Sequence, residues 1–379
     1  MSRSAPRRRA EPAPRRQRRA RTAPIPPATP VESPADSPAT TPAPPLADRE
    51  LSRRQRFTRS RGPFVIWAVV VLIGLVALVG CLLEVGPAWA CCGGAVTVTT
   101  AYAWALAVRT GGRPVVAGGV ALVLGVAAVL SDDDALRTGA AVLSAVVSAV
   151  FAVMATVPAV RFVAAVREVF VALVLAAIGA LATVGFEPVV KIVRFEYAAL
   201  GLALLGVFAI VYRLGAGLHG LGRRGLVIVL IGTVVLALTL AYAELLRRYG
   251  TPGLVTSLLD VVVWSRENLG AFPRPLETVL GVPALAWGVH MRARRRQGWW
   301  VCAFGVAATA PVATALVNTS VTLVESVLSV TYGAVVGLTI GFVVIRVDLA
   351  VTGPRGRRDR RAEEAGALRP EPRRTRALL

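Results

Sequence analysis

The chain has 379 residues, 55% of them hydrophobic, and a mean hydropathy of +0.62. This composition excludes an ordinary soluble globular domain. The net charge of +21 lies mostly at the two ends: residues 1–61 hold 15 Arg against 5 acids, and residues 346–379 hold 10 Arg against 5 acids. Because these basic stretches lack interleaved aromatic residues, we expect no nucleic-acid partner.

Residues 1–60 are rich in Arg, Pro, Ala, Ser and Thr and contain almost no apolar run. Such a segment cannot bury enough surface to offset its ordering entropy, so we expect a disordered cytoplasmic tail. We expect the same of the Arg-rich residues 347–379. Arginines in both tails are expected to attract anionic lipid headgroups. The dominance of Arg over the single Lys191, with heavy use of Ala, Gly, Pro and Val, indicates a GC-rich bacterial genome.

Residues 61–346 are predicted to form an all-α transmembrane domain of about ten helices. The apolar runs are 64–83, 91–108, 114–130, 139–160, 168–186, 197–212, 225–243, 277–291, 298–317 and 321–345. Three of them, at 114–130, 197–212 and 277–291, are short for a full crossing.

Charge in the connecting loops predicts the orientation of these runs. With the amino terminus inside, the inner loops 109–113, 161–167, 213–224 and 292–297 hold 11 Arg in 30 residues and no acid. The outer loops 84–90, 131–138, 187–196, 244–276 and 318–320 hold 7 Lys or Arg and 9 acids in 61 residues. Positive charge gathers on the cytoplasmic side of membrane proteins. We therefore expect a multi-pass plasma-membrane protein with both termini cytoplasmic.

The largest expected outer loop, 244–276, contains one further apolar stretch. Leu254 to Trp264 is too short to cross, and we expect it to lie at the interface or to dip back into the protein.

Cysteines flank the first outer loop. Cys81 could pair with Cys91 or with Cys92 if the loop faces an oxidising space, or all could be buried thiols. No C-x-x-C pair or neighbouring His accompanies them, so neither a zinc site nor any other metal or cofactor is expected.

The last apolar run, Val321 to Ile345, carries the most specific local signal. Every fourth residue is small or polar: Glu325, Ser329, Gly333, Gly337 and Gly341. The glycines predict a ridge against which another helix packs closely. Glu325 is the only acid that this reading places well inside an apolar run, so it is our candidate for a transport or charge site. The alternatives are a carboxyl that reaches the outer interface or bonds to a neighbouring helix.

Proline and aspartate supply weaker signals. Pro158, Pro283 and Pro311 are expected to break helices, as in many transporters, although proline is common in membrane helices generally. Asp132, Asp133 and Asp134 fall in an outer loop, where a solvated turn is a better interpretation than a cation site.

Three functions remain open at this stage. A secondary transporter or lipid flippase using Glu325 is favoured, followed by a non-catalytic membrane scaffold of a cell-envelope complex. A membrane-embedded enzyme acting on lipids, with the triple aspartate and the loop 244–276 outside, is less favoured; no H-E-x-x-H or G-x-S-x-G motif is present, and the absence of a Walker A motif argues against an ATP-driven motor. Expected partners are the bilayer, other membrane proteins and further copies of the chain.

Overall fold

The computed structural model describes residues 62–87, 89–131, 133–250, 252–294, 298–352 and 371–378. Within these ranges all regular secondary structure is helical, which confirms the predicted all-α class. The predictions of disorder for residues 1–60 and for most of 347–379 concern residues outside the described ranges.

The helices follow one another with short connections. In chain order they are α2 (Gly62–Leu82), α3 (Trp89–Arg109), α4 (Pro114–Leu130), α5 (Asp134–Met154), α6 (Phe162–Val184), α7 (Ile192–Val211), the π-helix η1 (Tyr212–Ala216), α8 (Gly217–Tyr249), α9 (Pro252–Leu269), the π-helix η2 (Glu277–Gly281), α10 (Val282–Arg292), α11 (Gly298–Ala303), α12 (Val306–Val317) and α13 (Leu323–Thr352).

Eight helical segments in the described residues are long and apolar enough to cross a membrane. They are Gly62–Leu82, Trp89–Arg109, Asp134–Met154, Phe162–Val184, Ile192–Leu214, Gly225–Tyr242, Gly298–Val317 and Leu323–Val351. The two remaining predicted runs are helical but shorter: 114–130 forms α4, and 277–291 forms η2 together with α10.

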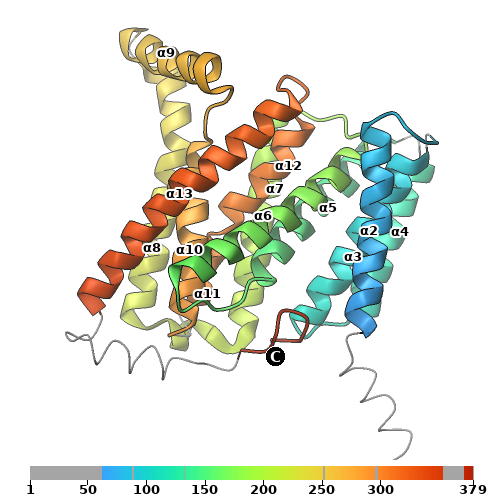
Figure 1. Ribbon diagram of the computed structural model, residues 1–379, viewed down its shortest axis with the longest axis horizontal. Coiled ribbons are helices and arrows are strands. Elements are labelled where there is room, and N and C mark those ends of the chain that lie inside the picture. The colour runs from blue at the N-terminus through green and yellow to red at the C-terminus, as the bar shows by residue number, and fades with distance from the viewer. Residues whose placement is uncertain are drawn as a thin grey trace, which may run out of the picture. The chain divides into compact units, whose positions relative to one another are not determined.

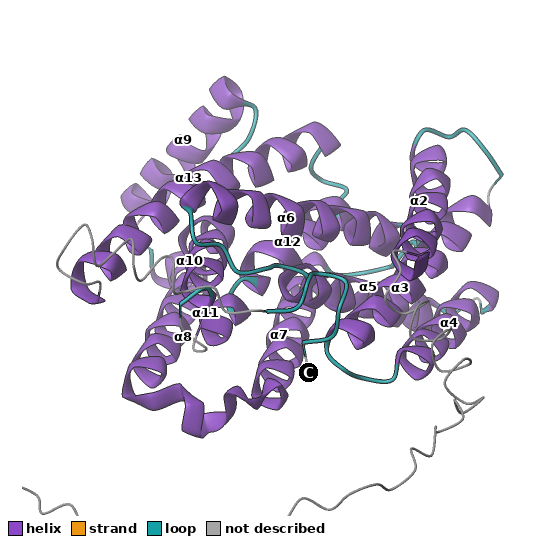
Figure 2. Cartoon of the chain, turned by 60° about the horizontal axis from the view of Figure 1, so that its bottom comes forward, coloured by secondary structure: helices purple, strands orange, loops and turns teal. Residues whose placement is uncertain are grey.

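The chain passes back and forth between two ends of the bundle, and α9 lies across one of them, so the connections gather at two ends (Figure 1). We call one the basic end; it contains residues 110–113, 155–161, 293–294 and 371–378. The opposite end contains residues 83–87, 185–191, 270–276 and 318–322. Figure 2 brings the basic end forward and shows its loops, including the one marked C, lying over helix ends.

Small side chains allow the central helices to pack closely. A Cβ added to Gly179 of α6 would fall 1.9 Å from the Oγ of Ser148 on α5, so these two helices are in direct contact. The segment formed by α11 and α12 is almost wholly enclosed by other helices, whereas α8 is hardly covered. Close contact at glycine and alanine is the expected way for helices to associate in a membrane, where burial from lipid gives little driving force.

Two expected loops are largely helical in the structure. Residues 213–224 belong to η1 and the start of α8, and α8 continues to Tyr249 before α9 begins at Pro252. The predicted interfacial stretch Leu254 to Trp264 lies within α9. Hydropathy marks only the apolar part of a helix, so polar extensions such as these are not separated from loops by composition.

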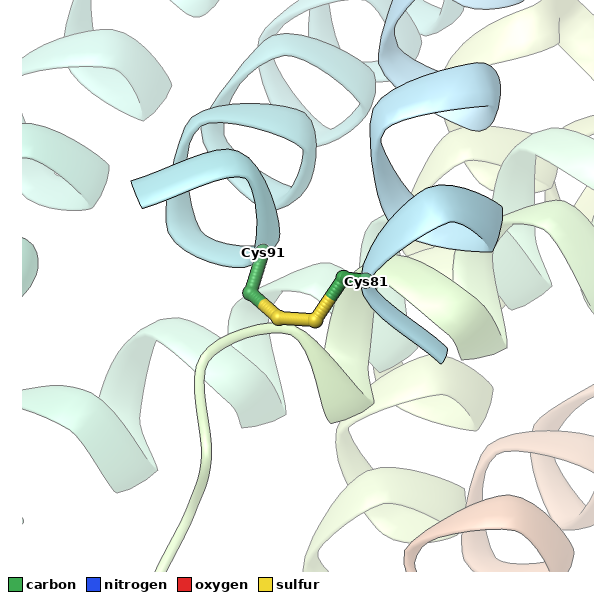
Figure 3. Close-up of a disulfide and its surroundings, with 2 residues drawn as sticks. All are labelled: Cys81 and Cys91. Carbon is green, nitrogen blue, oxygen red and sulfur yellow. A yellow bond between two sulfur atoms is a disulfide. The ribbon is translucent and has the colours of Figure 1, made fainter. Parts of the chain in front are cut away.

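A disulfide joins Cys81 near the end of α2 to Cys91 in the first turn of α3 (Figure 3). Their Cα atoms are 5.4 Å apart. Cys92 is a free, partly exposed thiol, and Cys302 is free and buried. Of the two pairings that the sequence left open, the structure forms the one with Cys91.

Candidate functional site

Glu325 lies in the first turn of α13 and is paired with a residue of α9. Its Oε1 is 3.1 Å from Nε of Arg266, and the two side chains are 23% and 56% exposed, respectively. The backbone N–H of Glu325 donates to Oγ1 of Thr322, which caps the helix. The predicted charge candidate thus has a counter-ion and partial access to solvent.

The small residues that follow Glu325 lie against η2, α10 and the segment before them. Ser329 Oγ donates to the carbonyl of Phe272 at 2.7 Å. A Cβ on Gly337 would come within 2.7 Å of Cβ of Val282, and one on Gly341 within 3.2 Å of Cβ of Ala286. A side chain at Gly337 would clash with α10 and one at Gly341 would fit tightly, so the small residues allow this close approach.

Glu277, at the start of η2, is an acid that the bundle encloses completely. It is 0% exposed, and within the described residues neither carboxyl oxygen has a hydrogen-bond partner. A Cβ on Gly333 of α13 would lie 3.0 Å from its carboxyl carbon. Burying such a group without a partner costs free energy, and unpaired buried polar groups are rare. Glu277 is therefore a functional candidate that the sequence analysis did not single out.

Irregular helix geometry surrounds this carboxyl. Glu277 begins the π-helical turn η2, and such turns are frequent at functional sites. Pro283 follows within the first turn of α10, and Pro311 lies inside α12. A Cβ on Gly281 would fall 2.2 Å from the backbone nitrogen of Ala308, so η2 and α12 are in backbone contact near both prolines.

Arg274, three residues before Glu277, points its guanidinium elsewhere. Its Nη1 donates to the carbonyl of Pro311 at 3.0 Å. The arginine brings positive charge near the carboxyl without forming a hydrogen bond to it.

The third proline of the sequence analysis, Pro158, lies outside the helices. It belongs to the connection after α5 and interrupts no helix there.

Two apolar grooves open on the sides of the bundle. One, of about 600 Å³, lies between α6, α12 and α13 and is lined by residues such as Phe170, Leu316 and Val330. The other, of about 470 Å³, lies between α2 and α3 beside Trp67. Glu277 lines neither groove.

A second group of charged side chains is buried at the basic end. Arg109 and Arg292 are each 1% exposed. Nη2 of Arg109 and Nη2 of Arg292 donate to the same carbonyl, that of Thr156, at 3.4 and 3.1 Å. Arg292 Nη1 also donates to Thr156 Oγ1 at 2.7 Å, and Arg109 Nε donates to the carbonyl of Met154 at 3.0 Å. The connection after α5 therefore joins the ends of α3 and α10.

Residues 371–378, which we call the C-terminal segment, lie on these arginines. Arg292 Nη2 is 2.6 Å from Oε2 of Glu371. Arg109 Nη1 donates to three backbone carbonyls, those of Pro372, Arg373 and Arg376, at 3.4, 3.0 and 2.8 Å. The N–H of Leu378 donates to the carbonyl of Arg109 at 2.9 Å.

Glu168 of α6 completes this basic-end cluster. It is 0% exposed, and its Oε2 accepts from Arg374 at 2.7 Å and from the N–H of Val157 at 3.0 Å. Its Oε1 accepts from Arg167 at 3.0 Å. Unlike Glu277, this buried carboxylate has several partners.

These buried charges are hard to recognise in the sequence, because each stands at the border of an apolar run. Glu168 and Glu277 are the first residues of their runs, and Arg109 and Arg292 are the first residues of expected loops. The irregular, proline-flanked start of the run at 277 was the one available signal.

The triple aspartate gives no support for a cation site. Asp133 caps α5, because its carboxylate accepts from the N–H of Ala135 at 2.8 Å, and Asp134 begins the helix. Asp132 lies outside the described residues. Within the described part of the chain, no three His, Cys, Asp or Glu residues group so as to hold a metal ion.

Comparison of the chain with protein-family models, with curated proteins and with solved structures gave no match.

Proposed function

We propose that the chain is a secondary transporter, with lipid flipping included in that class, and that the carboxyl of Glu277 carries the coupling proton or cation. The main evidence for this proposal is that the Glu277 carboxyl is fully enclosed and has no hydrogen-bond partner among the described residues. Ionisable groups inside the membrane are costly, and they commonly mark proton or ion pathways. Glu325, our choice from the sequence, is less suited to this role because Arg266 already neutralises it.

Irregular helix geometry near Glu277 supports this assignment. The π-turn η2, Pro283 and Pro311 place irregular backbone beside Glu277. Many transporters build their substrate and ion sites from interrupted helices near the middle of the membrane. A carboxyl in such a place can take up and release a proton or cation as the neighbouring helices rearrange.

We further propose ten crossings of the plasma membrane with both termini in the cytoplasm. Arginines gather at the basic end, in keeping with the positive-inside tendency. The Cys81–Cys91 disulfide lies at the opposite end, and disulfides persist in oxidising compartments. Both observations favour the basic end as the cytoplasmic one.

Solute-induced charge movement in proteoliposomes tests the proposed transport. Wild type, Glu277→Gln and Glu325→Gln would be compared on solid-supported membranes against sugars, amino acids, organic cations and organic anions. We expect at least one solute class to move charge in the wild type and in Glu325→Gln, but not in Glu277→Gln. Both substitutions remove one carboxylate and keep the side-chain volume, so Glu325→Gln is a matched control. Unchanged currents in Glu277→Gln would count against the proposal, and no current with any class would count against transport of these solutes.

A membrane scaffold remains the second candidate because of α8. The apolar stretch Gly225–Tyr242 is hardly covered by the other helices, and its Leu230 and Leu238 are among many exposed apolar residues. Lipid can cover such a helix, but so can a helix of another membrane protein. Association that depends on α8 and survives Glu277→Gln would favour this second function.

A further inference from the structure

We propose that Arg109 and Arg292 form a binding site for a phosphate group, and that the C-terminal segment occupies this site in the structure as an internal competitor. The proposal does not depend on the transport role of Glu277, because the two sites share no residue.

The donors that face the C-terminal segment are those that a phosphate would use. The three acceptors of Arg109 Nη1 all belong to the segment, and so does the carboxylate that pairs with Arg292 Nη2. Within the described residues, the buried Nε of Arg292 has no acceptor. Guanidinium groups bind phosphate through several parallel N–H···O bonds, so two converging arginines with donors to offer suit this anion.

The body of the protein holds both guanidinium groups in place independently of the segment. Arg292 stacks on the ring of Trp299, with its Cζ 3.4 Å from the ring centroid, and also bonds to Thr156. Arg109 is held by the carbonyls of Met154 and Thr156. Departure of the segment would therefore leave a preorganised pair of cations, which lowers the ordering cost of binding a ligand.

Charge favours a phosphate over the segment itself. The segment brings one carboxylate, Glu371, to two arginines, and the remaining acceptors that it offers to Arg109 are neutral carbonyls. Glu168 does not make up the difference, because it is shared between Arg167 and Arg374. A phosphate can carry two negative charges and so balance both buried arginines.

Two of the contacts that hold the segment are ion pairs, and both can be weakened without substituting either arginine of the site. Glu371 pairs with Arg292, and Arg374 pairs with Glu168. The double variant Glu371→Gln/Arg374→Gln keeps the net charge unchanged, because it removes one acidic and one basic group. Arg373→Gln/Arg376→Gln is the control in the same segment, since both of these side chains are exposed.

Binding would be measured on the full-length protein in phosphatidylcholine nanodiscs at constant ionic strength set with chloride. One arm titrates inorganic phosphate, and the other replaces part of the lipid with phosphatidic acid and detects retained lipid by native mass spectrometry. We expect Glu371→Gln/Arg374→Gln to bind at least one of these probes about tenfold or more tightly than the wild type, whereas the control stays within twofold. The arm that responds identifies a free phosphate or a lipid headgroup as the source.

Adding Arg292→Gln to the Glu371→Gln/Arg374→Gln protein should abolish this binding. If that protein does not fold, Arg292→Lys serves instead, and loss of bidentate geometry should still weaken binding about tenfold or more. Hydrogen exchange of residues 371–378 in the wild type should also become faster on addition of the binding probe. Failure of both probes to bind the double variant, or binding that is indifferent to Arg292, would overturn the proposal.

Discussion

The carboxyl carbon of Glu277 lies 3.0 Å from the position that a Cβ on Gly333 would take. The glycine ridge of α13 and the enclosed acid of η2 are thus two sides of one contact. A side chain at residue 333 would crowd the carboxyl, which would have to shift to make room.

Gly333→Ala should destabilise the protein by about 1–3 kcal/mol, as expected for overpacking at an enclosed site. Gly201→Ala on α7 is the matched control, because nothing lies within 4 Å of its added Cβ. That substitution should be neutral or stabilising by up to about 1 kcal/mol, since alanine favours helix more than glycine does. Thermal unfolding in detergent measures both effects. The shorter Glu277→Asp should restore part of the stability of Gly333→Ala, and a lack of rescue would argue against the contact.

Removing the Arg266–Glu325 ion pair should have little effect on stability. Its side chains are partly exposed, and pairs of this kind contribute about 0.2–1 kcal/mol. A double-mutant cycle with Arg266→Gln and Glu325→Gln should therefore give a coupling energy below about 1 kcal/mol. A coupling of several kcal/mol would show that α9 and α13 depend on this pair far more than its exposure suggests.

Alkylation should distinguish Cys92 from the two bridged cysteines. In protein kept oxidised, Cys92 should react, whereas Cys81 and Cys91 should become reactive only after reduction. Mass spectrometry of Cys91→Ser should show a newly reactive Cys81, and Cys92→Ser should leave the bridge intact. Loss of the bridge should cost about 2–3 kcal/mol for a closed loop this short. A free Cys81 in the oxidised wild type would refute the pairing.

Labelling of single cysteines in whole cells tests the proposed orientation. In a background without native cysteines, Val189→Cys at the opposite end should react with a membrane-impermeant maleimide added outside. Thr375→Cys at the basic end should react only after lysis. Both positions are exposed in the structure, so accessibility does not bias the comparison. Reaction of the two sites from the same side would overturn the proposed odd number of crossings between them.

Helix positions were largely predictable because a membrane-crossing helix needs about twenty apolar residues in a row. The run predicted at 64–83 forms α2 at Gly62–Leu82, and the run at 298–317 forms α11 and α12. The glycine spacing at 333, 337 and 341 likewise predicted a face for close packing, although not which helix lies against it.

Buried charge was much harder to predict. Glu277 stands at the edge of its apolar run, where hydropathy cannot distinguish an enclosed acid from an exposed one. Glu325 is the opposite case, because its place inside an apolar run suggests burial. Its carboxylate instead pairs with Arg266 of α9, whose apolar stretch is too short to be predicted as a crossing. Such partners are set by tertiary contacts between distant segments, which local composition does not encode.

The shared acceptor at the basic end has a consequence for genetics. Arg109 and Arg292 both donate to the main-chain oxygen of residue 156, which no change of codon at that position can delete. A saturation mutagenesis scan should thus find residue 156 permissive toward serine and only moderately sensitive to alanine, which would lose the hydroxyl bonded to Arg292. Substitutions of the two arginines should instead be poorly tolerated. So should deletions that shorten the α5–α6 connection, because they move the carbonyl oxygen of residue 156 away from both guanidinium groups.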